Sequence, residues 1–290
     1  MDFNDTPEEA AFRAEAAAWL ADNAPTADEV AGLSELAFAK LWQKRKYAAN
    51  WGCIGWDPAF GGRGATPIQR VIWDQEERKY NVPVNFFVIG QGMIAPTLMA
   101  WASDEDKARY LPDLASGERV WCQLFSEPAG GSDLAALRMR AEPDGDDWVL
   151  NGQKIWTSGA HYSDYGLVVV RTDPSVPKHQ GLTMFFLDMK SPGIEIKPIK
   201  QLNGESDFNE VYFTDVRVPD AQRLGAVGQG WKVALTTLMN ERMAIGAGSR
   251  GADVQLALDI ASKVTIDGRP AIEDSAVRAK IANFHVQEAG

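Results

Sequence analysis

Apolar residues recur at the spacing of one helix face through the first part of the chain. Thr6-Pro7-Glu8-Glu9 places a capping hydroxyl, a proline and two carboxylates where a helix begins. Phe12, Ala16 and Leu20 then follow at helical spacing, which is typical of a buried stripe. Further helices are expected over 36–50, 67–80, 92–102 and 103–110. The pattern therefore predicts an α-helical domain over residues 1–117.

Beyond Gly117 the apolar residues change to short runs rich in Val, Ile, Phe and Tyr. Turn-forming sequences such as Pro143-Asp144-Gly145-Asp146 and Asn151-Gly152 separate these runs. The expected strands are 120–125, 138–141, 148–150, 167–171, 183–187, 194–199 and 210–218. Short strands at this spacing predict a β-barrel or sandwich domain over residues 118–225.

Helical spacing returns in the last part of the chain. We expect one helix over 228–248 and a second that begins near Ser275, within a third segment over residues 226–290. The order is thus α, then β, then α, which is an α+β multidomain chain rather than an alternating Rossmann protein. The glycine cluster Gly61-Gly62-Arg63-Gly64 does not follow a strand, so it indicates a turn and not a dinucleotide fingerprint.

Composition narrows the class of protein. The 290 residues are 45% hydrophobic and carry a net charge of −11, which argues against a nucleic-acid surface. Apolar runs are too short to span a bilayer, and the acidic N-terminus resembles no signal or transit peptide, so a cytoplasmic location is expected. Cys53 and Cys122 are expected to be buried free thiols. No Cys, His or acidic spacing suggests a metal site.

Two motifs in the β-rich region carry chemistry. Ser126-Glu127-Pro128-Ala129-Gly130-Gly131-Ser132-Asp133 follows an apolar strand, and Asn151-Gly152-Gln153-Lys154-Ile155-Trp156-Thr157-Ser158-Gly159 comes soon after. Together they resemble the two signatures of the acyl-CoA dehydrogenase family. The segments 107–117 and 216–225 are similar to the family's links into and out of its middle domain.

The resemblance implies a fold and a cofactor. Family members have an α-helical N-terminal domain, a β-rich middle domain that binds FAD, and a C-terminal four-helix bundle, of which this chain would hold the opening. The implied activity is α,β-desaturation of an acyl-CoA in fatty acid or lipid catabolism. The implied partners are the acyl-CoA substrate and an electron-transferring flavoprotein. A homo-oligomer, dimer or tetramer, is also expected.

The first motif is expected to hold the pyrimidine end and the phosphates of FAD. By the resemblance, the Ser126 hydroxyl and backbone groups near Phe125 contact the flavin pyrimidine. Gly131 allows the backbone to approach the cofactor closely, and Ser132 lies by the pyrophosphate or the pantetheine.

The second motif is expected to hold the flavin ring itself. In the family, the residue corresponding to Trp156 packs on the isoalloxazine, and the hydroxyl corresponding to Ser158 bonds near its N5. A flavin needs such donors at its ring edge.

The resemblance also suggests a catalytic base. Family members remove the α-proton of the thioester with a glutamate while a β-hydride moves to flavin N5. A minority place this glutamate on the first bundle helix, immediately before an arginine, and Asn240-Glu241-Arg242 stands at that point. Glu241 is therefore the candidate base. The alternatives are a glutamate beyond residue 290, or a Glu241 that is only a solvated or Arg242-paired helix carboxylate.

Two departures from the family keep other functions open. The usual R-x-x-F-G segment is not found between Arg250 and Gly290, where Asp267-Gly268-Arg269-Pro270 stands instead. That sequence resembles a bacterial subset that includes enzymes acting on steroid or other bulky acyl chains. The bundle also ends early. A flavin monooxygenase or oxidase on the same fold, or a non-catalytic subunit of a heteromeric dehydrogenase, therefore remains an alternative.

Overall fold

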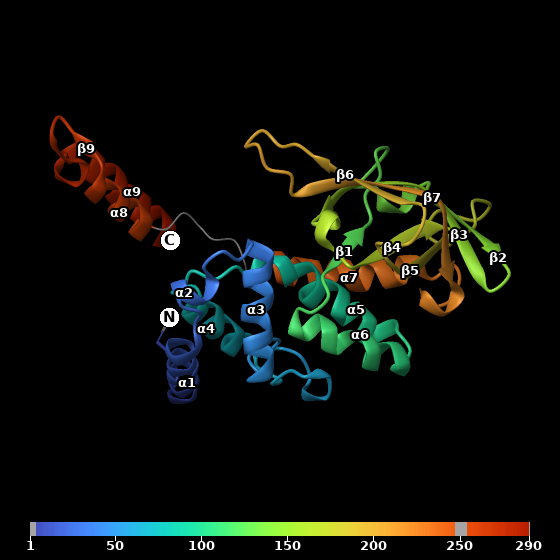
Figure 1. Ribbon diagram of the computed structural model, residues 1–290, viewed down its shortest axis with the longest axis horizontal. Helices are drawn as coiled ribbons and strands as arrows, with labels where there is room; N and C mark the ends of the chain where they lie inside the picture. Colours follow the sequence, from blue (N-terminus) through green and yellow to red (C-terminus); the bar gives the residue numbers. More distant parts are fainter. Residues whose placement is uncertain (1–3, 247–253, 290) are drawn as a thin grey trace. The chain divides into compact units, whose positions relative to one another are not determined.

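The chain forms two compact units in the computed structural model, which describes residues 4–246 and 254–289. The first unit is Met1–Ala244 and the second is Ile245–Gly290. The first contains a group of helices, an eight-stranded sheet and one long helix (Figure 1). The second is a helical pair (Figure 1).

The predicted N-terminal helices are confirmed. They are α1 (Pro7–Asn23), α2 (Ala27–Val30), α3 (Glu35–Ala48), α4 (Pro67–Glu77), α5 (Ala95–Trp101) and α6 (Asp104–Ser116). Thr6 and Glu9 exchange hydrogen bonds of 3.3 and 2.7 Å between side chain and backbone, which is the capping box that the sequence predicted in part. The short α2 was not expected. The helix predicted over 92–102 starts as a π-turn at Gly90–Ile94.

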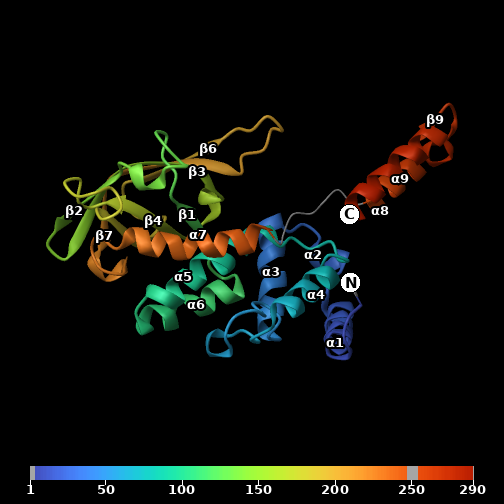
Figure 2. The same ribbon diagram turned by 180° about the vertical axis from the view of Figure 1, so that it is seen from behind.

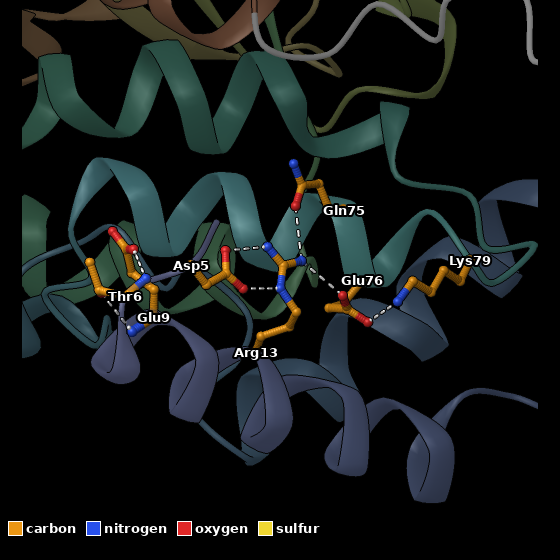
Figure 3. Close-up of polar contacts among 7 residues, drawn as sticks. All are labelled: Asp5, Thr6, Glu9, Arg13, Gln75, Glu76 and Lys79. Carbon is orange, nitrogen blue, oxygen red and sulfur yellow. Dashed lines mark hydrogen bonds and ion pairs between the residues drawn. The ribbon is translucent and has the colours of Figure 1, made fainter. Parts of the chain in front are cut away.

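A polar cluster joins α1 to α4 (Figure 3). The Arg13 guanidinium on α1 pairs with Asp5 and donates to Gln75 at 2.9 Å and to Glu76 at 3.0 Å. Lys79 pairs with the other oxygen of Glu76. Because the Glu76 side chain is only 3% exposed, this cluster compensates a buried carboxylate between the two helices.

The middle region is a single mixed sheet. Its strands are β1 (Trp121–Leu124), β2 (Arg140–Asp144), β3 (Asp147–Ser158), β4 (Tyr165–Arg171), β5 (Leu182–Asp188), β6 (Ile194–Ile199), β7 (Phe208–Pro219) and β8 (Arg223–Leu224). The order is β6-β7-β3-β2-β4-β5-β8, and β1 pairs in parallel with β4. The predicted β domain is confirmed. The third expected strand, 148–150, is longer in the structure. It spans Asp147–Ser158 and so includes most of the second motif.

The central strands β4 and β5 are buried on both faces. One face, with Val168 and Phe185, joins a core that the strands build among themselves. The other, with Leu167 and Phe186, packs against the helices. The long helix α7 (Gly230–Gly246) lies between the sheet and α5 and α6 (Figures 1 and 2). This confirms the predicted return to helix, although residues 247 and 248 lie outside the described residues.

The second unit is a short antiparallel helix pair. It comprises α8 (Val254–Lys263), the small hairpin β9 (Thr265–Ile266) and β10 (Arg269–Pro270), and α9 (Ser275–Ala289), with α8 and α9 side by side (Figure 2). The helix expected near Ser275 is confirmed, whereas α8 and the hairpin were not predicted. Asp267 and Gly268 have φ of 50° and 78°, as a tight two-residue hairpin turn requires.

Both cysteines are buried free thiols, as predicted. Burial raises the pKa of Cys53 and of Cys122 to about 12, so neither is a thiolate near neutrality. Within 4–246 and 254–289, no helix has the length and apolar character needed to cross a membrane.

Candidate functional site

The first motif forms a tight loop directly after β1. Phe125 is buried at the end of the strand, and Ser126 is half-buried. The backbones of Glu127 and Gly130 exchange two hydrogen bonds of 3.0 Å, which closes the turn. Gly131 and Ser132 follow in an exposed segment, so the loop presents its backbone and small side chains to the surroundings. A Cβ at Gly131 would contact the Ser126 Oγ at 3.5 Å, and its absence leaves that hydroxyl approachable.

The second motif lies on β3 and contains a β-bulge. The pairing register with β7 shifts between Lys154 and Thr157, and Trp156 between them has φ of 59°. The left-handed conformation is costly for a bulky residue and is enriched at functional sites. The bulge turns the Trp156 indole outward, where it is 58% exposed and meets Phe208 edge to face at 6.2 Å.

The structure brings the two motifs into direct contact. The Ile155 N–H donates to the Ser126 carbonyl at 2.9 Å, and the Lys154 Nζ donates to the Phe125 carbonyl at 3.1 Å. Trp156 follows directly on the same strand. Phe125 and Ser126, the candidate contacts of the flavin pyrimidine, are therefore held close in the backbone to Trp156, the candidate contact of the flavin ring.

Glu241 lies against the same strand that leads into the loop. It is half-buried on α7, and its Oε2 accepts from Gln123 Nε2 at 3.4 Å. Gln123 is on β1, two residues before Phe125. In the described part of the chain Glu241 forms no ion pair with Arg242, which is exposed. The tertiary structure thus brings the candidate base to the strand that leads into the candidate cofactor loop.

A cavity of about 590 Å³ borders the second motif. Ser158 and Gly159 form one wall, and Phe86 and Ile89 from the helical domain form another. Its other lining residues are Glu35, Asn85, Val120, Trp121, Tyr162, Ser163, Glu205 and Asp207. The end of the second motif therefore opens onto space between the helices and the sheet.

Three buried polar atoms near these elements have no hydrogen-bond partner among the described residues. They are Trp121 Nε1, Gln123 Oε1 and Thr157 Oγ1. Buried polar atoms are almost always paired, so each of these is a candidate contact for a ligand. Together with the outward indole and the open glycine, they fit a polar aromatic cofactor such as FAD.

Three residues of this site were not singled out from the sequence as functional. Gln123 was not predicted as a site residue, because the residue pattern of a strand does not show what each side chain contacts. Glu127 and Lys154 did carry a signal, since each is a charged residue inside one of the two motifs. The structure buries both, with side-chain exposures of 6% and 0%. Among the described residues, no group of three His, Cys, Asp or Glu side chains could hold a metal ion.

Comparisons with protein families decide the class of this chain. The family models described as acyl-CoA dehydrogenase N-terminal, middle and C-terminal domain match residues 6–118, 122–216 and 228–290. The chain belongs to the acyl-CoA dehydrogenase family. The predicted family, fold and enzyme class, an oxidoreductase acting on a CH–CH group, are thereby confirmed. The domain boundaries and site residues stay predictions.

Curated relatives include two acyl-CoA dehydrogenases of Mycobacterium tuberculosis. The protein named acyl-CoA dehydrogenase IpdE1 is 38% identical over 273 residues, which cover 91% of this chain and 70% of that protein. Acyl-CoA dehydrogenase FadE34 is 44% identical over 248 residues, which cover 84% of this chain but 33% of that protein.

Solved structures share the fold. The ChsE4-ChsE5 complex from Mycobacterium tuberculosis matches with a TM-score of 0.79 and 30% identity, over 99% of this chain and 74% of that one. A protein titled Tcur3481-Tcur3483 steroid ACAD matches with a TM-score of 0.81 at 30% identity, again over 99% and 74%. Both of these structural neighbours carry names that join two components.

Proposed function

We propose that this chain is an FAD-dependent acyl-CoA dehydrogenase that desaturates an acyl-CoA thioester between its α- and β-carbons. The observation that carries the proposal is the contact between Glu241 on α7 and Gln123 on β1. It joins the candidate catalytic carboxylate to the strand that leads into the first signature. Family membership supports the cofactor and the acyl-CoA substrate.

Each candidate residue has a defined part. Glu241 accepts the α-proton, and Gln123 holds its carboxylate by donating from Nε2. The Phe125 backbone and the Ser126 hydroxyl hold the pyrimidine end of FAD. Trp156 offers its exposed indole face to the ring. When bound, FAD would accept the β-hydride at N5.

The remaining contacts set the orientation of the cofactor. Ser158 donates near N5, while Gly131 and Ser132 line the path of the pyrophosphate. Electrons then leave to an electron-transferring flavoprotein, which remains the expected acceptor.

Replacing the candidate base tests the mechanism. Glu241→Gln keeps the shape and removes the basicity, so the rate of anaerobic flavin reduction by acyl-CoA should fall by ~10²–10⁴-fold while FAD stays bound. Stopped-flow absorbance at the flavin band measures this rate. Glu105→Gln, at an exposed carboxylate on α6, is the control and should reduce at the wild-type rate. A Glu241→Gln protein that reduces normally rules out this base.

The substrate class is proposed as a bulky acyl group. The sequence around Asp267-Gly268 resembles bacterial members that act on such chains, and one structural relative is titled a steroid ACAD. Anaerobic titration with straight-chain, branched, aromatic and steroid acyl-CoAs would show which class bleaches the flavin. Bleaching by NAD(P)H instead would favour the monooxygenase alternative.

A second candidate function is that of one subunit in a two-component dehydrogenase. It is favoured by the ChsE4-ChsE5 complex and the Tcur3481-Tcur3483 protein, which combine two named components. It is also favoured by the missing R-x-x-F-G segment. Purification alone and together with a candidate second subunit separates the two functions. A chain that binds FAD and oxidises acyl-CoA only in the presence of the second subunit belongs to a heteromer.

A further inference from the structure

A buried ammonium lies beneath the first signature loop. Lys154 on β3 is 0% exposed, and its Nζ donates to the Glu127 Oε1 at 2.9 Å and to the Phe125 carbonyl at 3.1 Å. The two acceptors flank Ser126 in the chain. One side chain from the second motif therefore holds the first motif on both sides of its candidate flavin-binding hydroxyl.

The Glu127 carboxylate is fully engaged. Besides Lys154, its Oε2 accepts from the Arg138 N–H at 2.6 Å and its Oε1 accepts from the Met139 N–H at 2.9 Å. These backbone donors lie where the chain leaves the loop for β2. Because charge-assisted bonds reach both ends of the loop, the segment between them has little freedom to change its path.

The network also fixes the second motif. Ile155, the neighbour of Lys154, donates its N–H to the Ser126 carbonyl at 2.9 Å. The bulge with Trp156 follows at once. The distance between the Ser126 hydroxyl and the Trp156 indole is thus set by the backbone on either side of a single buried ion pair.

Burying this ion pair has a desolvation cost. Burial lowers the pKa of Lys154 to about 8, although Glu127 opposes the shift. An apolar pair of similar volume would usually be as stable or more so. It could not, however, donate to the Phe125 carbonyl or accept from the Arg138 and Met139 N–H groups, so an apolar replacement would lose the bonds that hold the loop.

We propose that Lys154 and Glu127 are positioning residues of the FAD site, which hold Ser126 and Trp156 at the spacing that the flavin ring requires. This inference rests on the proposed binding of FAD and names residues that act on the cofactor only through others. It predicts that breaking the pair weakens FAD binding even where the protein stays folded.

A second buried ion pair provides the matched control. Lys46 on α3 donates to Glu77 on α4 at 2.8 Å, with side-chain exposures of 7% and 10%. Trp42 donates to the same carboxylate at 2.8 Å. This pair lies in the helical domain and contacts neither signature. Lys46→Met should therefore lower stability as Lys154→Met does, without changing the flavin site.

The experiment compares FAD affinity with stability in the full chain. Apoprotein of the wild type, Lys154→Met, Lys46→Met and the double variant Lys154→Met/Glu127→Gln is titrated with FAD, and the visible spectrum and melting temperature are recorded. We expect the FAD dissociation constant of Lys154→Met to rise by ~10- to 100-fold, with an altered flavin band shape, because a charge-assisted bond is lost. Lys46→Met should stay within about 3-fold of the wild type.

The double variant separates positioning from folding. It leaves no uncompensated buried charge, so we expect its melting temperature to exceed that of Lys154→Met while its FAD affinity stays low. If Lys154→Met binds FAD with the wild-type dissociation constant and spectrum, the positioning role is overturned and the proposed cofactor stands. If Lys154→Met does not fold, the same result with the double variant overturns the positioning role. A wild-type chain that takes up no FAD overturns the proposed cofactor and this inference with it.

Discussion

At the scale of single residues, the candidate site depends on a backbone conformation that the residue type does not predict. Trp156 occupies the left-handed region at φ of 59° and exposes most of its indole. A bulky residue tolerates this only where the surrounding structure enforces it, here through the bulge on β3. An unfavourable backbone and an exposed apolar ring at one residue are understandable if the ring serves a ligand.

Trp156→Gly tests that interpretation. Glycine adopts positive φ freely, so relief of strain should offset the lost contact with Phe208 and leave the unfolding free energy within ~1 kcal/mol of the wild type. FAD binding should weaken by ~3- to 10-fold, because one aromatic face is lost. Urea denaturation and FAD titration measure the two effects.

Asp267→Gly is the matched control for this prediction. Asp267 also has a positive φ, 50°, but lies in the hairpin of the second unit. It should be neutral or stabilising, with unchanged FAD affinity. Equal FAD affinity of the Trp156→Gly protein and the wild type would show that the indole is not part of the cofactor site.

At the scale of elements, a few polar contacts join segments that are distant in sequence. Arg13 links α1 to α4 by compensating Glu76 (Figure 3). Arg13→Ala leaves that buried carboxylate with Lys79 alone, so the unfolding free energy should fall by ~1–2 kcal/mol. Urea denaturation followed by circular dichroism measures the loss. Lys197→Ala, which breaks an exposed pair with Glu195, should cost less than ~0.5 kcal/mol.

A second contact joins the end of β7 to β3 and β8. The hydrogen bond from Arg223, and then that from the Trp148 indole, lower the pKa of Asp220 to about 2. A lowered pKa in the folded state means that the contribution of Asp220 to stability is present above the unfolded pKa of ~4 and is lost as pH falls towards 2.

Asp220→Asn should therefore flatten the acid limb of the stability curve. Between about pH 4 and about pH 2, the melting temperature of the wild type should fall more steeply than that of the variant. Asp146→Asn, at a neighbouring exposed turn, serves as the control and should follow the wild type. Parallel curves for the wild type and Asp220→Asn would contradict the role of this carboxylate.

At the scale of the whole molecule, the net charge of −11 opposes the approach of an acyl-CoA, which is itself anionic. Raising the ionic strength from about 0.01 to 0.15 M shortens the Debye length from ~30 to ~8 Å. We therefore expect the association rate of acyl-CoA to rise ~2- to 5-fold over this range. Stopped-flow binding measures it, with an uncharged N-acetylcysteamine thioester of the same acyl group as the control. A rate that falls with salt would mean that local cations dominate the approach.

The order of the helical and β-rich regions and the family could be predicted from the sequence. Helical and strand spacing depend on local preference and on which face is buried, so they predicted most elements correctly. Short pieces with little burial, such as α2 and the β9–β10 hairpin, escaped because their signal is weak. The two signatures likewise stood out because their residue types occur in order along the chain.

Which side chains contact one another could not be predicted from the sequence and follows from the tertiary fold. Glu241 and Gln123 are 118 residues apart, and their contact follows from the packing of α7 against β1. The burial of Lys154 with Glu127 was not predicted either, although both charges stand inside the motifs, because strand spacing treats a charged residue as solvent-facing unless its partner is known. The physical reason is the same in both cases: hydrogen bonds and ion pairs are set by distances through space, which a local pattern does not contain.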